Sequence, residues 1–416
     1  MNTLPTLEGI QEARNQLKGI CKQTPFVKSE RLSQQVNASV FLKREDLQEI
    51  RSFKIRGAYT KMNGLTSAKR RQGVLCASAG NHAQGVAYTC KALKIQGHVY
   101  MPATTPQQKV AQVQYFGGDY VNTVLVGDTY DECQQVAFEA AKKEKKIFIH
   151  AFDDLQVIEG QATIALELLE QYPEGLDTLL VPIGGGGLIA GLLTVFKSLS
   201  PQTEIIGVEP MGASSMKLAL DNGQRIPLQT MDRFVDGAAV REVGTLPFSI
   251  CSSHLQTILT VDEGKICQTL LDLYNKDGIV AEPAGALAIS ALDQLGKSYE
   301  KKTIGVMLCG GNNDILRMQE IRERALIYAN LKHYFLVQFP QRSGALKEFV
   351  TLILGSTDDI THFEFSKKNY RNSAPAVVGI ELQQASDFDL LVKRMKKHKF
   401  KYQYLNDKPD LFQFLV

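Results

Sequence analysis

Short apolar segments alternate with longer amphipathic segments from about residue 39 to residue 330. The apolar segments have the length of buried strands, and helix-length patterns lie between several of them. The expected strands are Val40–Lys43, Gly73–Ala77, Gly97–Met101, Tyr120–Val126, Ile147–His150, Leu179–Ile183, Glu204–Glu209 and Thr303–Leu308, and the expected helices include His82–Leu93, Gln107–Phe116, Asp128–Lys143 and Val157–Tyr172. This alternation predicts the α/β class, with parallel sheets covered by helices on both faces.

The order of elements changes after Asn330, where the pattern becomes strand, helix, strand, strand, helix, strand. These elements are expected at His333–Phe339, Gly344–Leu354, Ile360–Ser366, Ala376–Leu382, Asp387–Lys397 and finally at either Phe400–Tyr404 or Leu411–Val416. A βαββαβ order in this length is typical of a ferredoxin-like unit. The pattern therefore predicts two domains, residues 1–330 and residues 331–416.

One uncharged segment of 19 residues, Thr178–Phe196, is long enough to span a bilayer. It contains Pro182 and the four consecutive glycines Gly184–Gly187, which disfavour a continuous helix. The better interpretation is a buried strand (Thr178–Ile183), a glycine turn and a buried helix (Leu188–Leu199).

The composition says little about partners, but it shows where along the chain the excess positive charge lies. The 416 residues are 44% hydrophobic and 22% charged, as in an ordinary soluble protein, and the formal net charge is only +3. Residues 331–416 carry 13 basic and 9 acidic groups, against 34 and 35 in the rest of the chain. We expect neither a nucleic-acid nor a membrane partner, and the basic run Lys393–Lys399 is best interpreted as a solvated helix end.

The cysteines and the first residues of the chain provide information about the cellular location of the protein. Seven cysteines are scattered without a CxxC pair, which favours reduced thiols over disulfides or a zinc site. The opening residues resemble neither a signal peptide nor a transit peptide. We therefore expect a cytoplasmic location.

Lys54, within Ser52-Phe53-Lys54-Ile55-Arg56-Gly57-Ala58, is the first candidate for chemistry. Burial lowers the pKa of a lysine and makes it a base or a nucleophile that forms a Schiff base with a carbonyl. The apolar neighbours Phe53 and Ile55 fit such burial. The alternative is a solvated lysine at a helix start, since most lysines are exposed.

A small polar turn, Ser78-Ala79-Gly80-Asn81, follows the expected strand Gly73–Ala77. A strand that leads through such a turn into a helix presents unpaired backbone N–H groups, which suit a carboxylate or a phosphate. The Asn81 amide is also a donor for a ligand oxygen. The alternative is that Asn81 or Ser78 only caps the helix, and we expect His82 to be structural or exposed.

Two further glycine turns follow buried strands. Gly184, Gly185, Gly186 and Gly187, with Leu188, let backbone N–H groups converge on a phosphate at a helix start. Gly185, Gly187 and Ala190 also fit G-x-G-x-x-A, with Glu209 ending the next strand, so a dinucleotide site is an alternative; a purely structural turn is another. Cys309 opens the second turn, where it is either a ligand contact or a small buried hydrophobe. Histidine and cysteine spacing indicates no metal site.

In this order, the motifs resemble those of the fold-type II pyridoxal-phosphate enzymes, and most closely the threonine dehydratases. The resemblance rests on KREDLQEIRSFKIRGA, SAGNHAQGVA, VPIGGGGL, GVEP, AEPAGA and CGGNND, spread over residues 43–314. It implies a two-lobed, tryptophan synthase β-like core, with a smaller lobe at roughly residues 53–155. FPQRSGAL in the tail resembles the start of an ACT-like regulatory domain, as in the short biosynthetic form of the enzyme.

The resemblance implies a role for each candidate residue. Lys54 would form the Schiff base with pyridoxal 5'-phosphate and act as the catalytic base, and Asn81 would bind the ring hydroxyl. Gly184 to Leu188 would bind the phosphate, and Cys309 would face the pyridine nitrogen. Ser78, Ala79, Gly80 and Asn81 would hold the substrate carboxylate.

The implied reaction is β-elimination of water from L-threonine, giving 2-oxobutanoate and ammonia at the start of isoleucine biosynthesis. The implied partners are L-threonine, the effector L-isoleucine and further copies of the chain, in a dimer or a tetramer. Serine dehydratase is the nearest alternative; an NAD-dependent oxidoreductase and an amino-acid-binding regulator without activity are the others.

The sequence departs from relatives of the family at two positions. Serine racemases place a serine where this chain has Ala79, so proton transfer on both faces of the substrate is not expected. A cation site in some relatives pairs the acidic residue of GVEP with a second acidic side chain six residues later. Here Glu209 is present but the later position is Ser215, so no metal is assigned.

Overall fold

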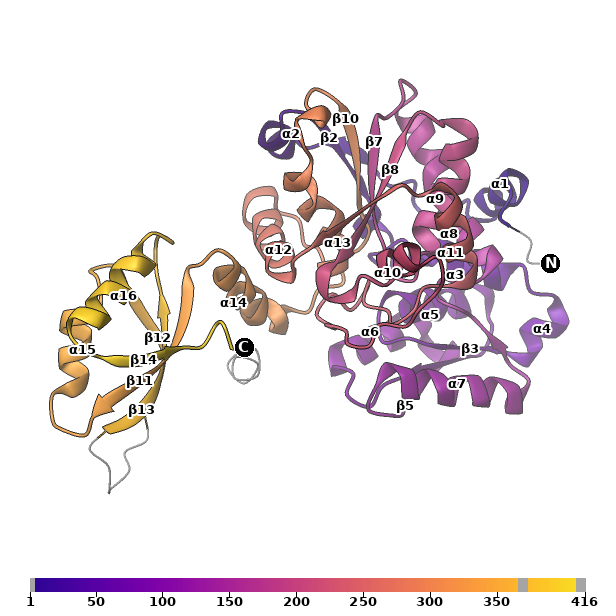
Figure 1. Cartoon of the computed structure of the whole chain (residues 1–416). Helices are drawn as coiled ribbons and strands as arrows, with labels where there is room; N and C mark the ends of the chain where they lie inside the picture. The colour runs from indigo at the N-terminus through magenta and orange to yellow at the C-terminus, as the bar shows by residue number, and fades with distance from the viewer. Residues whose placement is uncertain (1–3, 366–372, 409–416) are drawn as a thin grey trace. The chain divides into compact units, whose positions relative to one another are not determined.

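The computed structural model describes residues 4–365 and 373–408. Contacts divide the chain into two compact units, one made of Met1–Glu263 and Leu273–Asp314 and the other of Gly264–Asp272 and Ile315–Val416. Figure 1 labels the elements of both units. The division by contacts differs from the change in sequence pattern at Asn330, and the boundary between residues 330 and 331 stays a prediction.

A six-stranded sheet forms the larger layer of the first unit, in the order β1-β2-β10-β7-β8-β9. Its strands are β1 (Phe26–Lys28), β2 (Ser39–Arg44), β10 (Thr303–Leu308), β7 (Thr178–Pro182), β8 (Glu204–Pro210) and β9 (Thr257–Val261). All neighbours are parallel except β1, which pairs antiparallel with β2. The hydrophobic pattern does not predict β1 or β9, because both are short and only partly buried.

A four-stranded parallel sheet forms the second layer, in the order β5-β4-β3-β6. Its strands are β5 (Val121–Leu125), β4 (Gly97–Met101), β3 (Val74–Ala77) and β6 (Ile147–Phe148). The predicted strand Ile147–His150 is therefore shorter than expected. One parallel sheet and one sheet that is parallel except for β1, with helices between their strands, confirm the α/β class.

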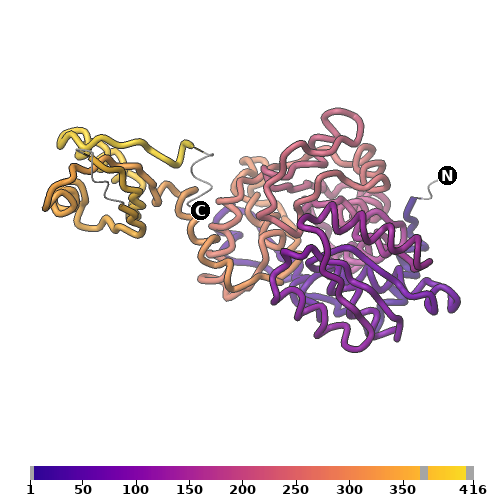
Figure 2. The backbone as a smooth tube through the Cα atoms, turned by 90° about the horizontal axis from the view of Figure 1, so that it is seen from below, coloured from indigo at the N-terminus to yellow at the C-terminus, as the bar shows by residue number. Residues whose placement is uncertain are grey.

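Helices connect the strands of both sheets, and the backbone trace in Figure 2 follows these connections. The helices of the chain are α1 (Leu7–Gln16), α2 (Glu30–Val36), α3 (Lys54–Asn63), α4 (Ser67–Gln72), α5 (Asn81–Leu93), α6 (Gln107–Gly117), α7 (Tyr130–Glu144), α8 (Leu155–Gln171), α9 (Gly187–Leu199), α10 (Ser215–Asn222), α11 (Thr245–His254), α12 (Glu263–Asp277), α13 (Pro283–Ser290), α14 (Met318–Tyr328), α15 (Ala345–Ile353) and α16 (Asp387–Lys397). The uncharged segment from Thr178 is a strand, a turn and a helix, as predicted. Among the described residues, no helix has both the length and the apolar character needed to cross a membrane.

The second unit contains a four-stranded antiparallel sheet in the order β12-β13-β11-β14. Its strands are β12 (Asp359–Phe365), β13 (Ser373–Glu381), β11 (Lys332–Pro340) and β14 (Lys401–Tyr404). Alternate residues of β11 and β13 pack with α15 and α16 in one apolar core. The predicted βαββαβ order is confirmed, with the last strand at the first of its two expected places; Ser366 and Leu411–Val416 lie outside the described residues.

Candidate active site

A cavity of about 490 Å³ lies within the first unit. Its wall includes Ser78, Pro102, His150, Gly185 and Cys309, each of which follows the end of a parallel strand. The two sheets of this unit therefore direct the carboxyl ends of their strands toward the same space. This is the place where open α/β sheets bind ligands.

Lys54 lies at the start of α3 and lines this cavity. Its Nζ donates a hydrogen bond to the carbonyl oxygen of Ala151 at 3.0 Å and lies 5.3 Å from the centre of the Phe53 ring. Burial lowers the pKa of Lys54 to about 8, and electrostatic interactions with Cys309 and Glu282 oppose this effect only in part. The amine is therefore far more often neutral at physiological pH than that of an exposed lysine, which is what a nucleophile or base requires.

The turn from Ser78 to Asn81 connects β3 to α5 along the cavity wall. Ser78 Oγ accepts a hydrogen bond from the Gly80 N–H at 3.2 Å, and no side chain caps the start of α5. Asn81 is the first residue of this helix, one earlier than predicted, and its amide bonds Glu282 and Asn312 instead of the helix backbone. Capping therefore does not account for Asn81, and the helix keeps N–H groups that an anion can use.

The glycine turn after β7 allows no side chains. A Cβ on Gly185 would lie 2.2 Å from the Phe152 ring, and one on Gly187 would lie 2.9 Å from the Phe152 carbonyl oxygen. Gly186 has a φ of +91°, in the left-handed region that favours glycine. Gly187 begins α9 without a side-chain cap, so backbone N–H groups at this helix start remain available to an anion.

The members of the glycine turn differ in how they meet the cavity. Gly185 is among the residues that line it, whereas Leu188 is buried in the protein. The predicted binding residues Gly184 to Leu188 thus form one continuous turn, of which Gly185 contacts the main cavity. Their assignment to a phosphate stays a prediction.

Cys309 directly follows β10, the strand that pairs with β7, which leads into the glycine turn. It is 4% exposed. Its Sγ donates to the carbonyl oxygen of Ala284 at 3.2 Å. Burial raises the pKa of the Cys309 thiol well above its usual value. Near neutral pH it is therefore an uncharged group that lines the cavity.

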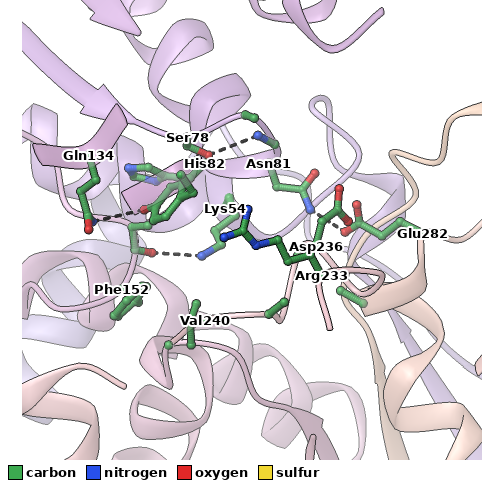
Figure 3. A pocket seen from close by; sticks show the side chains of 18 of the residues that line it. Lys54, Ser78, Asn81, His82, Gln134, Phe152, Arg233, Asp236, Val240 and Glu282 are labelled. Carbon is green, nitrogen blue, oxygen red and sulfur yellow. Dashed lines mark hydrogen bonds between the residues drawn. The ribbon is translucent and has the colours of Figure 1, made fainter. Parts of the chain in front are cut away.

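Glu282 is a buried cavity residue that the sequence analysis did not single out. It precedes Pro283, the first residue of α13, and its carboxylate accepts a hydrogen bond from Asn81 Nδ2. Burial raises the pKa of Glu282 to about 7. Figure 3 shows Glu282 and Asn81 side by side, with Lys54 on the same cavity. A carboxylate that precedes a proline at a helix start was visible in the sequence, but nothing there indicated its neighbours.

A second missed feature is the segment 223–244 between α10 and α11, which supplies much of the remaining wall. Arg233, Asp236 and Val240 from this segment line the same cavity as Lys54, and Figure 3 shows Asp236 beside Glu282. The segment has no regular secondary structure, and the backbone N–H of Leu228 bonds the carbonyl oxygen of Arg241 across its base. It has no hydrophobic period, so pattern analysis could not place it.

His82 and Glu209 have structural partners. His82 Nε2 faces the carbonyl oxygen of Ile149 at 2.9 Å, and burial lowers the pKa of His82 to about 3, so it is neutral. Glu209 accepts from the N–H groups of Met216 and Lys217 at 2.7 and 2.8 Å, at the start of α10. Within the described part of the chain, no group of three or more His, Cys, Asp or Glu side chains is arranged to hold a metal ion.

Comparison with known sequences identifies the family. Residues 17–310 match the family described as pyridoxal-phosphate dependent enzyme, and residues 323–415 match the C-terminal regulatory domain of threonine dehydratase. The chain is 50% identical over 410 residues to the biosynthetic L-threonine dehydratase IlvA of Halalkalibacterium halodurans, covering 99% of each chain. The corresponding protein of Bacillus subtilis is 47% identical over 415 residues, covering 100% of this chain and 98% of the other.

The chain belongs to the pyridoxal-phosphate-dependent threonine dehydratases. Solved structures agree with this family: threonine deaminase isoform 2 from Solanum lycopersicum superposes with a TM-score of 0.71 and 36% identity, over 78% of this chain and 96% of that one. Maize serine racemase superposes with a TM-score of 0.72 at 28% identity, over 78% of this chain and 99% of that one. Membership of the threonine dehydratases excludes the dinucleotide interpretation of the glycine turn, because the matched family depends on pyridoxal phosphate.

The cavity of this family member fits the cofactor on its own geometry. Lys54 offers an amine with a lowered pKa, as a Schiff-base linkage requires. The turn at Gly185 and Gly187 leaves no room for a Cβ and ends in an uncapped helix start, which suits a phosphate. The neutral thiol of Cys309 suits contact with an uncharged ring nitrogen.

Proposed function

We propose that this chain catalyses the deamination of L-threonine to 2-oxobutanoate and ammonia, the first step of isoleucine biosynthesis, by β-elimination of water. The observation that carries the proposal is the Lys54 amine, whose pKa burial lowers to about 8 in a cavity lined by both sheets. When it is bound there, pyridoxal phosphate supplies an electron sink next to the substrate Cα.

The residues of the chain then have separate tasks. Lys54 would hold the cofactor through its amine and, when that amine is free, would remove the proton from the substrate Cα as a general base. The N–H groups of the turn from Ser78 to Asn81 bind the substrate carboxylate, because they lie at an uncapped helix start. Ala79 has no hydroxyl to act as a second base, which favours elimination over racemisation.

The remaining residues of the site hold the cofactor. The turn Gly184–Leu188 binds its phosphate through backbone N–H groups, and Asn81 donates to its ring oxygen. Cys309 would face the ring nitrogen, and its neutral thiol would leave that nitrogen unprotonated, which would make the cofactor a weaker electron sink suited to prompt loss of the β-hydroxyl. Exchange of the substrate α-hydrogen without elimination would count against this role of Cys309.

The test is the substitution Lys54→Ala in the full-length enzyme. The wild type is expected to show a yellow, borohydride-sensitive absorbance and to release 2-oxobutanoate from threonine, and the variant is expected to lose both. Lys217→Ala, at an exposed lysine on α10, is the control and is expected to lose neither. If Lys54→Ala kept the absorbance and the turnover, the assignment of Lys54 would be wrong.

Threonine is the proposed substrate on the strength of the relatives' names, and L-serine dehydratase is the alternative. A ratio of kcat/KM for threonine over serine above one supports the proposal. A ratio well below one supports the alternative.

For residues 331–416 we propose an ACT-like regulatory domain that binds isoleucine and inhibits residues 1–330, the catalytic domain with its smaller lobe at roughly 53–155. The match to a threonine dehydratase regulatory domain supports this role. Truncation after Asn330 is expected to abolish inhibition by isoleucine while the cofactor absorbance persists; retained inhibition contradicts the proposal. We further propose a cytoplasmic homo-oligomer, a dimer or a tetramer, which light scattering would measure.

A further inference from the structure

Three side chains from distant parts of the sequence form a hydrogen-bonded chain along the wall of the cavity. Asn312 Nδ2 donates to the carbonyl oxygen of Ile50 at 2.8 Å and to Asn81 Oδ1 at 2.6 Å. Asn81 Nδ2 donates in turn to Glu282. The chain thus connects the segments that follow β10 and β2 to the starts of α5 and α13.

The direction of these hydrogen bonds follows from the backbone carbonyl group of Ile50. A backbone carbonyl only accepts, so the Asn312 atom facing Ile50 must be its amide nitrogen. The same nitrogen, with its second hydrogen, faces Asn81, which must therefore present its oxygen there. The Asn81 nitrogen is then directed to Glu282, whose ionised carboxylate also only accepts. The orientation of the Asn81 amide is consequently fixed without reference to any ligand.

One hydrogen of the Asn81 amide remains available. Its oxygen accepts from Asn312 and one N–H donates to Glu282, while the side chain lines the cavity and is only partly buried. Among the described residues, the second N–H has no partner. Asn81 thus presents a donor, and no acceptor, to whatever oxygen lies against it.

We propose that Asn312 is a positioning residue that holds the Asn81 amide as a hydrogen-bond donor toward the cavity, so that the cofactor's ring oxygen is bound in its deprotonated form. The inference rests on the proposed function, since it concerns how Asn81 meets the cofactor. A hydrogen bond to the charged form of a group lowers the pKa of that group. Without Asn312 only Glu282 holds the Asn81 amide, so the amide turns over more readily and then offers its oxygen, which repels an oxyanion.

Glu282 holds the nitrogen end of the Asn81 amide, whereas Asn312 holds its oxygen end. The groups that face it are Asn81 on α5, Lys54 on α3, Asp236 in the segment 223–244, Lys109 on α6 and Cys309 after β10. Burial and the negative charge of Asp236 raise the pKa of Glu282, whereas Asn81, Lys109 and Lys54 lower it. When ionised, Glu282 accepts from Asn81 and supports the same amide orientation that Asn312 imposes.

The experiment is a double-mutant cycle on the cofactor-loaded enzyme, read from the pH midpoint of its visible absorbance. Asn312→Ala is expected to raise the midpoint by roughly one pH unit, the value of one charge-assisted hydrogen bond. Asn81→Ala is expected to raise it at least as far. Because Asn312 acts through Asn81, the double variant is expected to match Asn81→Ala alone.

Several outcomes overturn the inference. An unchanged midpoint in Asn312→Ala does so, and so do shifts that add in the double variant, because additivity means independent roles. Asn312→Asp keeps the side-chain volume but cannot donate, so it must also raise the midpoint. In the Asn81→Ala background, the same substitution must leave the midpoint unchanged. If circular dichroism shows that both Asn312 variants are unfolded, the residue is structural and the inference is wrong.

The controls separate this inference from the proposed function. Asn222→Ala, at an exposed asparagine that bonds the carbonyl oxygen of Leu218, is expected to leave the midpoint unchanged. A wild type without the visible absorbance contradicts the proposed function itself. A wild type with the absorbance but an Asn312→Ala variant with the same midpoint contradicts only the role of Asn312.

Discussion

Lys109 on α6 forms an ion pair with Asp236, and both residues line the cavity. Lys109 lies between β4 and β5 of the four-stranded sheet, whereas Asp236 lies between β8 and β9 of the six-stranded sheet. The pair therefore connects the two layers of the first unit beside the proposed catalytic residues. Both charges also act on Glu282, in opposite directions.

This arrangement predicts opposite pH shifts for two substitutions that break the same ion pair. Asp236→Asn removes a negative charge and lowers the pKa of Glu282, so the acid limb of kcat/KM moves to lower pH. Lys109→Met removes a positive charge, raises that pKa and moves the limb to higher pH. Measuring kcat/KM from pH 5.5 to 8.5 tests these opposite shifts. If only the loss of the ion pair mattered, the acid limb would move in the same direction in both variants.

Because the pKa of Lys54 is lowered, we expect the stability of the cofactor-free protein to depend on pH. Its folded-state pKa of about 8 lies below the unfolded value of about 10.4, so the unfolded chain binds more protons between these values. The free energy of unfolding should therefore rise with pH across this window, and by less in Lys54→Met. Urea unfolding of both proteins at pH 7.5, 8.5 and 9.5 gives the difference; parallel curves would contradict the lowered pKa.

Gly185→Ala is expected to weaken cofactor binding by at least tenfold. A Cβ at this position meets the Phe152 ring at 2.2 Å, so either the ring or the glycine turn must move. Such overpacking costs about 1–3 kcal/mol of stability. Fluorescence titration of the cofactor-free protein measures the affinity. The matched control is Gly296→Ala, where a Cβ meets nothing within 4 Å; equal affinities for the two variants would disprove the steric argument.

A buried charge cluster anchors α3 two residues after Lys54. Arg56 is 1% exposed and pairs with Glu45 at 2.8 Å and with Glu167 at 2.6 Å, and Lys43 also pairs with Glu167 at 2.6 Å. Arg56→Met leaves two carboxylates with one cation, and removing one partner of such a cluster costs about 3–5 kcal/mol. Urea unfolding at pH 7 tests this.

An exposed ion pair provides the comparison. Lys217→Met removes a pair with Asp221 on α10, in which both side chains are largely solvent-exposed. Its expected effect on the free energy of unfolding is below about 0.5 kcal/mol. Similar losses for Arg56→Met and Lys217→Met would show that the buried cluster contributes no more than a surface pair.

The residues that local sequence could identify are those that end strands. The turn from Ser78 to Asn81, the glycines from Gly184 and Cys309 all lie where an apolar strand gives way to small or polar residues, and these three turns line one cavity. Lys54, at the start of α3, lines the same cavity. The pattern of apolar residues also predicted the α/β class and the βαββαβ order, whereas the two-lobed core was implied only by the family resemblance.

What the sequence could not indicate is how these turns connect to each other. Asn81 bonds Glu282 and Asn312, which lie 201 and 231 residues further along the chain. No local period records such a contact, so neither partner was singled out. The segment 223–244 was missed for a different reason: its backbone is fixed by bonds such as that between Leu228 and Arg241, and it has no repeating pattern.

The pairing of β2 with β10 has a consequence for synthesis. Ser39 lies opposite Thr303 on two neighbouring interior strands of the six-stranded sheet. This sheet therefore cannot be completed until nearly the whole first unit has left the ribosome. The four-stranded sheet needs only residues 74–148 and has all its strands much earlier. Non-local pairing forms late because loop closure costs entropy. A nascent chain therefore carries Lys54 long before it has a cavity in which that lysine can react.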